Sequence, residues 1–316
     1  MSTKSTEASL RKRLNKLSDD WARYHSRRPP VLYHYTDAAG LLGMLNTRRL
    51  WATNSGFMND PTEMEYAARI VRETAQSQAG KYPTALFKRV MQNIELVLAA
   101  YAPDQNDEYL TCFCENGDLL SQWRGYGASG GGYALGFDSR QVGFRYYQNR
   151  EKPEPVLRKV LYDQKAQKGL VGRFIGLLLE WETLRSRKGR RNSDIDNSDD
   201  AWYSFNWFIS ECLNCFKDPA YSEEQEWRVI QYGRNMAAEK FVQTQFRASR
   251  NRIIEYVELD FTRLSGQKKG QLPLKSIRYG PTLDPKVTER GLWLLCQRNG
   301  YGDSIKIERS GVPFSG

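Results

Sequence analysis

Two periodicities alternate along this chain, and their irregular alternation limits the folds that it can adopt. Short runs of β-branched and aromatic residues, such as VLYHYT at 31–36 and RIIEYVELDF at 252–261, have the composition of strands. Longer segments, such as 8–25 and 285–302, repeat apolar residues every three or four positions, which is typical of amphipathic helices. Strands and helices that are interleaved without a regular βαβ spacing favour an α+β fold over a doubly wound one.

The same patterns predict the remaining elements. We expect further strands in the segments 49–54, 108–116, 130–138, 152–163, 223–233, 272–281 and 304–310. We expect further helices in the segments 38–48, 62–101, 119–127, 164–187 and 201–216. No internal repeat is visible, and no change in composition marks a second domain. We therefore expect one α+β domain at 31–316, preceded by a basic helical arm at 1–30.

Positive charge is concentrated in two segments of the chain. The formal net charge is +10, and the excess lies mainly in residues 1–30 and in RSRKGRR at 185–191. Such runs are usually solvated surface, but they also suit a polyanionic partner such as RNA or DNA. A nucleic-acid partner would contact the basic residues Arg11, Lys12, Arg13, Arg187, Lys188, Arg190 and Arg191.

Apolar runs in this sequence are short. None approaches the roughly 18 residues that a membrane helix needs. Residues 1–30 also lack the apolar core of a secretory signal. We therefore expect a cytoplasmic protein that does not contact a membrane.

The five cysteines, an odd number, do not favour a disulfide framework. Two interpretations remain for the pairs Cys112 with Cys114 and Cys212 with Cys215. They could form a four-thiolate zinc site, or they could be apolar thiols buried on a strand and a helix. Burial explains the spacing at least as well, so we expect no metal.

Several common catalytic signatures are absent from the sequence. The glycine run GASGGG lacks the Lys-Ser/Thr ending and the following helix of a phosphate-binding loop. No G-x-S-x-G elbow is present. The two histidines, His25 and His34, leave a hydrolytic triad without an identifiable nucleophile.

The acidic segment EEQEWRV at 223–229 is the strongest candidate for a catalytic group. Glu224 and Glu226 share an orientation if the strand has already begun, and a strand holds a carboxylate rigidly. The first interpretation is structural: a solvated acidic turn in which Arg228 pairs with a glutamate. The second is functional: a carboxylate that stabilises positive charge on an anomeric carbon, which requires no metal.

Four segments together resemble one bacterial family. They are LYHYTDAAGLLGMLNTRRLWATNSGFMNDPTE, CFCENGDLLSQWRGYGASGGGYALGFD, YSEEQEWRVI and the ending IRYGP…IKIERSGVPF. By these segments, in order from about residue 31 to the C-terminus, the chain is similar to the family known as domain of unknown function 2971. That name states no activity.

The first segment also looks like the opening of ADP-ribosyltransferases of the His-Tyr-Glu class, because a strand with H-x-T precedes a helix and a short strand. This resemblance implies a mixed, mostly antiparallel split sheet with surrounding helices. It implies NAD as the substrate, His34 as the ribose anchor and the backbone of Tyr35 as the clamp on the nicotinamide amide. Glu226 would be the catalytic carboxylate, and Glu224 would complete an E-x-E pair.

The resemblance leaves the aromatic residue that stacks on nicotinamide ambiguous. We favour Tyr126, and the alternatives are Phe113, Trp123 and Tyr133. The expected NAD-binding set is completed by Thr36 of the H-x-T motif, Asn59 of the NDP turn and Arg228. The sequence departs from the superfamily in two ways: Tyr35 replaces the usual glycine, and LLSQWRGYG adds a helix-like segment.

The resemblance implies transfer of ADP-ribose from NAD to a macromolecule, with nucleic acid favoured over protein. Such an enzyme could be a toxin or a phage-defence effector with a regulatory or antitoxin partner. Cleaving the nicotinamide–ribose bond needs oriented charges more than acid–base power. Two other functions stay open. One is an inactive sensor of the same fold that binds a nucleotide or a partner. The other is a nuclease that binds magnesium through Asp60, Glu63, Glu224 and Glu226.

Overall fold

A computed structural model describes most of the chain, which forms two compact units. The described residues are 6–58, 62–102, 107–126, 131–143, 154–187, 200–233, 242–249, 252–261 and 271–314. The first unit comprises 1–26, 58–106 and 160–221, and the second comprises 27–57, 107–159 and 222–316. The predicted arm at 1–30 and single domain at 31–316 remain predictions about independent folding.

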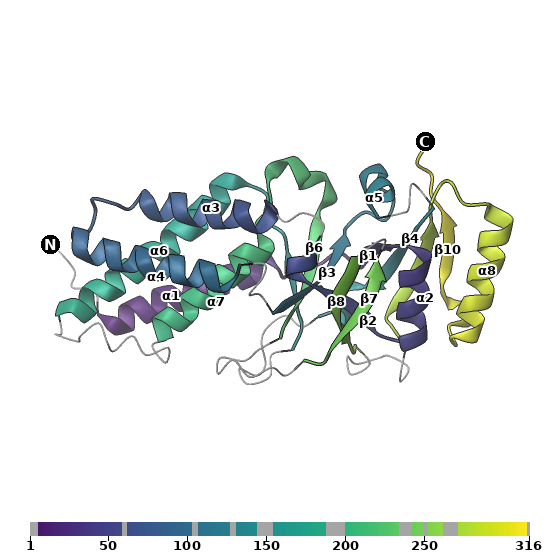
Figure 1. Cartoon of the computed structure of the whole chain (residues 1–316), viewed down its shortest axis with the longest axis horizontal. Coiled ribbons are helices and arrows are strands. Elements are labelled where there is room, and N and C mark those ends of the chain that lie inside the picture. Colours follow the sequence, from purple (N-terminus) through teal and green to yellow (C-terminus); the bar gives the residue numbers. More distant parts are fainter. Residues whose placement is uncertain are drawn as a thin grey trace. The chain divides into compact units, whose positions relative to one another are not determined.

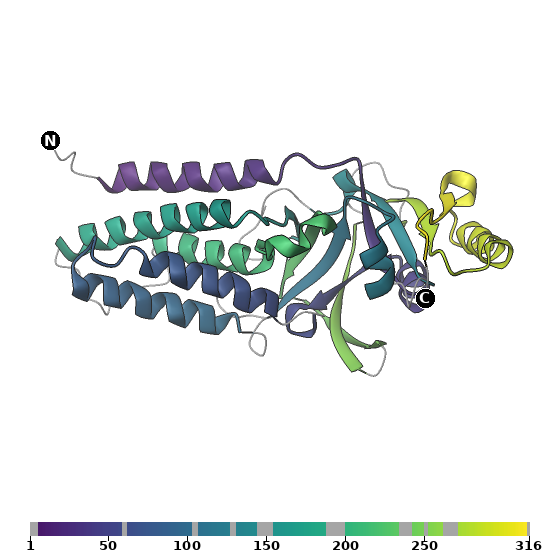
Figure 2. The ribbon, with the colours of Figure 1, turned by 90° about the horizontal axis from the view of Figure 1, so that it is seen from above.

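The described residues of the first unit, here the helical unit, form five α-helices (Figures 1 and 2). They are α1 (Glu7–Tyr24), α3 (Thr62–Gln76), α4 (Thr84–Ala100), α6 (Gln164–Arg187) and α7 (Asp200–Cys215). Helix α1 begins at Thr6, whose hydroxyl accepts a hydrogen bond from the Ser9 amide. It buries Trp21, whose indole N–H donates to the buried Glu211 of α7 at 3.0 Å. Residues of the expected arm therefore pack into the helical unit.

The structure differs from the sequence prediction at 62–101, where two helices replace the single expected one. Helix α3 ends at Gln76 and α4 begins at Thr84. Between them Gly80 adopts a φ of +84°, a left-handed conformation that favours glycine. Pro83 stands at the N-cap of α4, where the missing N–H of proline costs no helical hydrogen bond.

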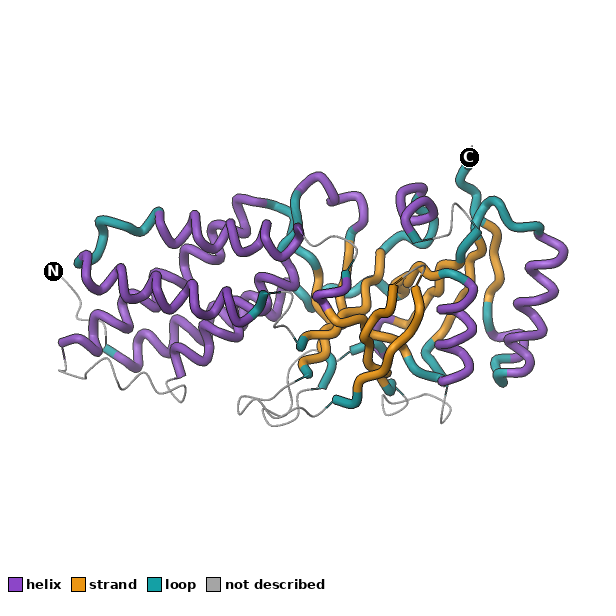
Figure 3. Tube along the Cα trace, viewed as in Figure 1, coloured by secondary structure: helices purple, strands orange, loops and turns teal. Residues whose placement is uncertain are grey.

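The second unit, here the sheet unit, contains all ten strands that the described residues form (Figure 3). They are β1 (Val31–Thr36), β2 (Leu50–Asn54), β3 (Glu108–Cys114), β4 (Tyr133–Asp138), β5 (Val156–Lys159), β6 (Glu226–Tyr232), β7 (Thr244–Ser249), β8 (Arg252–Leu259), β9 (Leu274–Tyr279) and β10 (Lys306–Arg309). The main path of the sheet is β10-β9-β4-β1-β3-β2-β8-β7, and β6 pairs with β3 and β5. The pair β9–β10 is parallel, and the other pairs described are antiparallel. The predicted mixed, mostly antiparallel α+β fold is confirmed.

Helices of the sheet unit connect and flank these strands. The α-helices are α2 (Ala38–Thr47), α5 (Leu120–Gly125) and α8 (Pro285–Arg298). Short 3₁₀ turns occur at η1 (Ser55–Phe57), η2 (Ser139–Gln141), η4 (Pro219–Glu224) and η5 (Gly302–Ser304). Among the described helices, none is both long and apolar enough to cross a membrane.

Strand β3 connects the main path of the sheet to the off-path strands β6 and β5. It pairs with β6 along its whole length, but it meets β1 at one register position, where Tyr33 lies opposite Cys114. It meets β2 at two positions near its other end. Strands β1 and β2 therefore diverge along the same edge of β3, and α2 connects them.

A hydrophobic core fills the inside of the sheet unit. It includes side chains from α2 and from most strands, among them Leu32, Leu45, Phe113, Leu135 and Trp227. A smaller cluster around Tyr35 and Trp123 packs with the C-terminal segment. These two clusters belong to opposite faces of β1, because Leu32 and Tyr35 differ by an odd number of positions.

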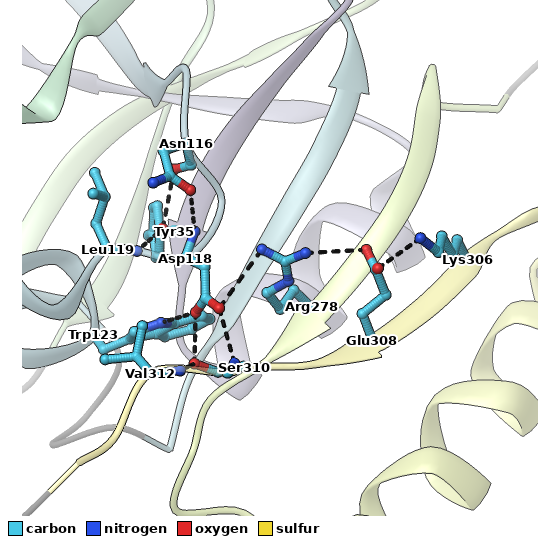
Figure 4. Close-up of polar contacts among 11 residues, drawn as sticks. Tyr35, Asn116, Asp118, Leu119, Trp123, Arg278, Lys306, Glu308, Ser310 and Val312 are labelled. Atoms are coloured by element: carbon cyan, nitrogen blue, oxygen red, sulfur yellow. Dashed lines mark hydrogen bonds and ion pairs between the residues drawn. The ribbon is translucent and has the colours of Figure 1, made fainter.

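Asp118 ties the C-terminal segment to the loop before α5 (Figure 4). Its carboxylate accepts hydrogen bonds from the indole of Trp123 at 2.8 Å, the hydroxyl of Ser310 at 2.5 Å and the amide of Gly311 at 2.9 Å. The guanidinium of Arg278 lies 3.8 Å from the same carboxylate. One acidic side chain therefore organises three segments that are distant in sequence.

Replacing Asp118 by alanine should weaken the attachment of the C-terminal segment to the loop before α5. We expect the free energy of unfolding to fall by about 1–3 kcal/mol, because several hydrogen bonds to one charged acceptor are lost. The amide of Gly311 should exchange faster with deuterium. Asp303→Ala is the matched control, since Asp303 also accepts from an indole, that of Trp293, but at an exposed site. Equal effects of the two substitutions would contradict the role given to Asp118.

Candidate functional site

His34 lies on β1, where this strand diverges from β2. Its Nδ1 is 2.9 Å from the carbonyl oxygen of Cys112 on β3. Its ring lies 5.8 Å from that of Phe113. Burial lowers the pKa of His34 to about 4, and the positive charge of Arg247 lowers it further against the opposing hydrogen bond to Cys112. His34 is therefore neutral at physiological pH.

The neutral state of His34 fixes the roles of its two nitrogens. A carbonyl oxygen only accepts hydrogen bonds, so Nδ1 of His34 must carry the proton and donate to Cys112. The second nitrogen, Nε2, then carries a lone pair and is an acceptor. An acceptor of this kind suits a hydroxyl group, such as that of a ribose, rather than an anion.

Arg247 of β7 lies in an aromatic environment close to His34. Its guanidinium carbon is 5.5 Å from the ring centroid of Trp51 and 5.8 Å from that of Tyr256. Its Nη2 donates to the hydroxyl of Thr53 at 3.0 Å. Burial lowers the pKa of Arg247, and the carboxylate of Asp37 opposes this shift. An arginine remains charged under such conditions. We call His34, Asp37, Trp51, Thr53, Arg247 and Tyr256 the His34–Arg247 cluster.

Two N–H donors of this cluster are unused within the described part of the chain. They are the buried indole Nε1 of Trp51 and the buried Nε of Arg247. A buried donor without an acceptor costs about 1–3 kcal/mol. Both donors belong to groups that bind oxygen acceptors, and one belongs to a cation. The cluster is therefore suited to an anionic group such as a phosphate or a carboxylate.

Glu226, the expected catalytic carboxylate, forms a buried ion pair at the start of β6. Its two oxygens accept hydrogen bonds from Nε and Nη2 of Arg228 at 2.8 and 3.0 Å. Glu226 is 4 % exposed and Arg228 is 3 % exposed. This geometry corresponds to the structural interpretation of the acidic segment, in which Arg228 pairs with a glutamate. Glu224 lies outside the strand, at the end of the turn η4, where it is half-buried.

The register of the sheet places His34 and Glu226 on different faces, although the transferase hypothesis requires them in one groove. Glu226 lies opposite Cys114, and Cys114 lies opposite Tyr33. Side chains of directly opposed residues share a face, and successive residues of a strand alternate. Glu226 therefore shares its face with Tyr33, whereas the ring of His34 lies against Phe113. The expected meeting of His34 and Glu226 in one groove is not formed by this register.

The aromatic residues expected to stack on nicotinamide occupy different environments. Phe113 and Trp123 are fully buried, and the Trp123 indole is bonded to Asp118. Tyr133 is half-buried, and burial raises its pKa. Tyr126 is 41 % exposed at the C-cap of α5. Of these four residues, only Tyr126 and Tyr133 have exposed surface that a ligand can contact.

The neighbours of His34 on β1 have structural roles. The Tyr35 hydroxyl donates to the carbonyl of Asn116 at 3.1 Å and accepts from the amide of Leu119 at 2.9 Å. Its side chain is buried away from His34, as a tyrosine at the usual glycine position requires. Thr36 faces α2, since a Cβ at Gly40 would lie 2.1 Å from the Thr36 hydroxyl. Gly40 therefore allows the first turn of α2 to approach β1.

The other predicted residues are distributed over the chain. Asn59, Asp60, Lys188, Arg190 and Arg191 lie outside the described residues. The other residues lie in the helical unit. On α1, Arg13 pairs with Glu180, Arg11 lies over the Trp181 ring, and Lys12 is exposed. Arg187 is the last residue of α6, and Glu63 of α3 pairs with Lys217. Among the described residues, no three His, Cys, Asp or Glu side chains form a group that could hold a metal ion.

Sequence reasoning missed the residues that complete the cluster around His34. Trp51 was assigned to a strand without a role, and Arg247 lies on β7, a strand that was not predicted. The sequence TQFRAS has little apolar alternation, and Phe246 is 67 % exposed. The one available signal was the TQFRAS segment's position before RIIEYVELDF, which makes a hairpin possible.

Comparison with known proteins gives limited information. No curated protein and no solved structure matches the chain. One family model matches residues 122–229, about a third of the chain, and the family is described as "Protein of unknown function (DUF2971)". This match begins within α5, ends at Val229 of β6 and includes the helices between them, so the chain is similar to the DUF2971 family over this segment.

Proposed function

We propose that this protein binds a nucleotide of the NAD class at the His34–Arg247 cluster and acts as a sensor that does not transfer ADP-ribose. The observation that carries this proposal is a pair of buried donors, Nε of Arg247 and Nε1 of Trp51, which have no acceptor among the described residues. A phosphate oxygen at hydrogen-bond distance would satisfy either donor. The neutral His34 supplies an acceptor for a ribose hydroxyl, and the aromatic rings supply flat surfaces for a base.

The choice of a sensor over an enzyme rests on Glu226. A carboxylate that stabilises a developing positive charge must face the reacting atom. The carboxylate of Glu226 forms an ion pair with Arg228, and Glu226 is 4 % exposed. An ion pair of this kind neutralises the charge that the transfer reaction needs.

The transferase remains the second candidate, favoured by one specific observation. His34 holds its Nδ1 proton on a backbone carbonyl and leaves Nε2 as an acceptor. This is the orientation that the resemblance to ADP-ribosyltransferases implies for a ribose anchor. The two candidates differ in turnover: the transferase releases nicotinamide, and the sensor does not.

The Arg247→Gln substitution tests the proposed binding site. We expect isothermal titration calorimetry to show saturable NAD binding to the wild type and at least about tenfold weaker binding to the variant, because one hydrogen bond to a charged group contributes about 1.5–3 kcal/mol. Arg252→Gln is the matched control, since Arg252 is exposed on the same hairpin.

Two results would count against this site. One is equal NAD affinity in the wild type and in Arg247→Gln, with both proteins folded by circular dichroism. The other is nicotinamide release by the wild type at a rate that Glu226→Gln abolishes, which would favour the transferase.

A further inference from the structure

A cavity of about 530 Å³ lies between α3 and α6 of the helical unit. The residues that line it are Glu73, Thr74, Ser77, Gln78, Lys168, Gly169, Gly172 and Arg173. Its volume falls within the range of about 300–1,000 Å³ that is usual for small-molecule sites. Six of the eight lining residues have polar or charged side chains, and the other two are glycines.

Thr74 is the most informative residue of this lining. Its side chain is buried, with 7 % exposed, and its hydroxyl has no hydrogen-bond partner among the described residues. Buried hydroxyls are normally satisfied. The Ser77 hydroxyl, one turn later, donates instead to the carbonyl of Thr74 at 2.6 Å. The described residues therefore leave the Thr74 hydroxyl without a hydrogen-bond partner.

The charge of the cavity is positive. The carboxylate of Glu73 lies 3.1 Å from Nζ of Lys168 and 3.7 Å from Nη1 of Arg69. Its negative charge is therefore balanced by these two cations. The exposed Arg173 adds a further guanidinium on the same side of α6. An arginine presents paired donors that match the oxygens of a phosphate.

Two glycines of α6 keep the floor of the cavity open. A Cβ at Gly169 would meet nothing within 4 Å, and one at Gly172 would lie 3.5 Å from Cγ2 of Thr74. Glycine within a helix is destabilising relative to alanine. Neither glycine is required by close packing. A larger side chain at Gly169 would therefore clash with no neighbour and would only reduce the volume of the cavity.

We infer that this cavity binds a phosphomonoester of about mononucleotide size. The phosphate contacts Arg173 and Lys168, and a hydroxyl or base edge of the ligand contacts Thr74 and Gln78. The carboxylate of Glu73 keeps Lys168 oriented toward the cavity. This site lies wholly in the helical unit, and its residues are distinct from those of the His34–Arg247 cluster.

Calorimetric titration of the full-length protein with AMP tests this inference. Arg173→Gln and Thr74→Val should each weaken AMP binding at least tenfold. Lys165→Gln, which removes an exposed cation of α6 outside the cavity, should leave it unchanged. Arg247→Gln should also leave it unchanged, which separates this site from the proposed nucleotide site. Adenosine, which lacks the phosphate, should bind at least tenfold more weakly than AMP.

Three results with the wild type and the cavity variants would overturn the inference. They are the absence of saturable AMP binding, equal binding of AMP and adenosine, and AMP binding that is retained in both Arg173→Gln and Thr74→Val. Loss of AMP binding in Arg247→Gln alone would also overturn it, because the ligand would then occupy the other site. Thermal unfolding of each variant shows whether the protein is folded under the conditions of the titration.

Discussion

Replacing Glu226 by glutamine should lower the free energy of unfolding by about 3–5 kcal/mol. The change leaves Arg228 buried without its bidentate carboxylate partner, and breaking a buried ion pair by removing one partner has a cost of this size. The measurement is urea unfolding followed by tryptophan fluorescence. Glu224→Gln is the matched control, because Glu224 is only half-buried, at the end of the turn that precedes the strand, and its cost should be below about 1 kcal/mol.

A double variant separates a structural role from a catalytic one. Glu226→Leu combined with Arg228→Met removes both charges, and apolar replacement of a whole ion pair is often neutral or stabilising. We therefore expect the double variant to recover most of the stability that Glu226→Gln loses. If Glu226→Gln were as stable as the wild type, the carboxylate would not be held by Arg228 in solution.

Stability of the wild type should fall between pH 6.5 and pH 4 because of His34. Burial lowers the pKa of His34 from 6.5 to about 4 in the folded protein. Above pH 6.5 the imidazole is neutral in both states, so its contribution is complete. As the pH falls, the unfolded chain binds a proton that the folded protein excludes, and stability is lost until the folded pKa is reached. The total loss is about 3 kcal/mol, since one pKa unit corresponds to about 1.4 kcal/mol.

Comparison with His34→Gln isolates this effect. The variant retains His25 and all carboxylates, so their contributions cancel in the difference between the two proteins. We expect the free energy of unfolding of the wild type to fall more steeply than that of the variant, by about 3 kcal/mol over this range. Parallel pH dependences would show that the pKa of His34 is not lowered in the folded protein.

The elements with strong local patterns could be predicted from the sequence. The strand at 31–36, the helix capped by Asp37 and the helix at 285–298 formed as expected, because their apolar spacing and caps agree with their environments. The strand β7 could not be predicted, because its stability comes from pairing with β8 rather than from its own composition. The segments that form each compact unit could not be identified from the sequence, since each unit is assembled from three separate segments.

The candidate site was only partly accessible from the sequence. His34 was identified by its scarcity and its place on a strand, and its hydrogen bond to Cys112 depends on the divergence of β1 and β2. Arg247 lies about two hundred positions later and joins the cluster through the hairpin β7–β8. Glu226 was assigned a catalytic role from its segment, but the cross-strand register and its pairing with Arg228 are properties of the folded sheet.

A crystal structure of the protein with NAD tests the central claim most directly. We predict density for an intact dinucleotide at the His34–Arg247 cluster, with a phosphate oxygen in hydrogen-bond contact with Nε of Arg247 and Nε1 of Trp51. The ion pair between Glu226 and Arg228 should be unchanged. The proposal would be contradicted if the nucleotide contacted Glu226 instead, with Arg228 displaced and the nicotinamide–ribose bond broken. That result would favour the transferase hypothesis.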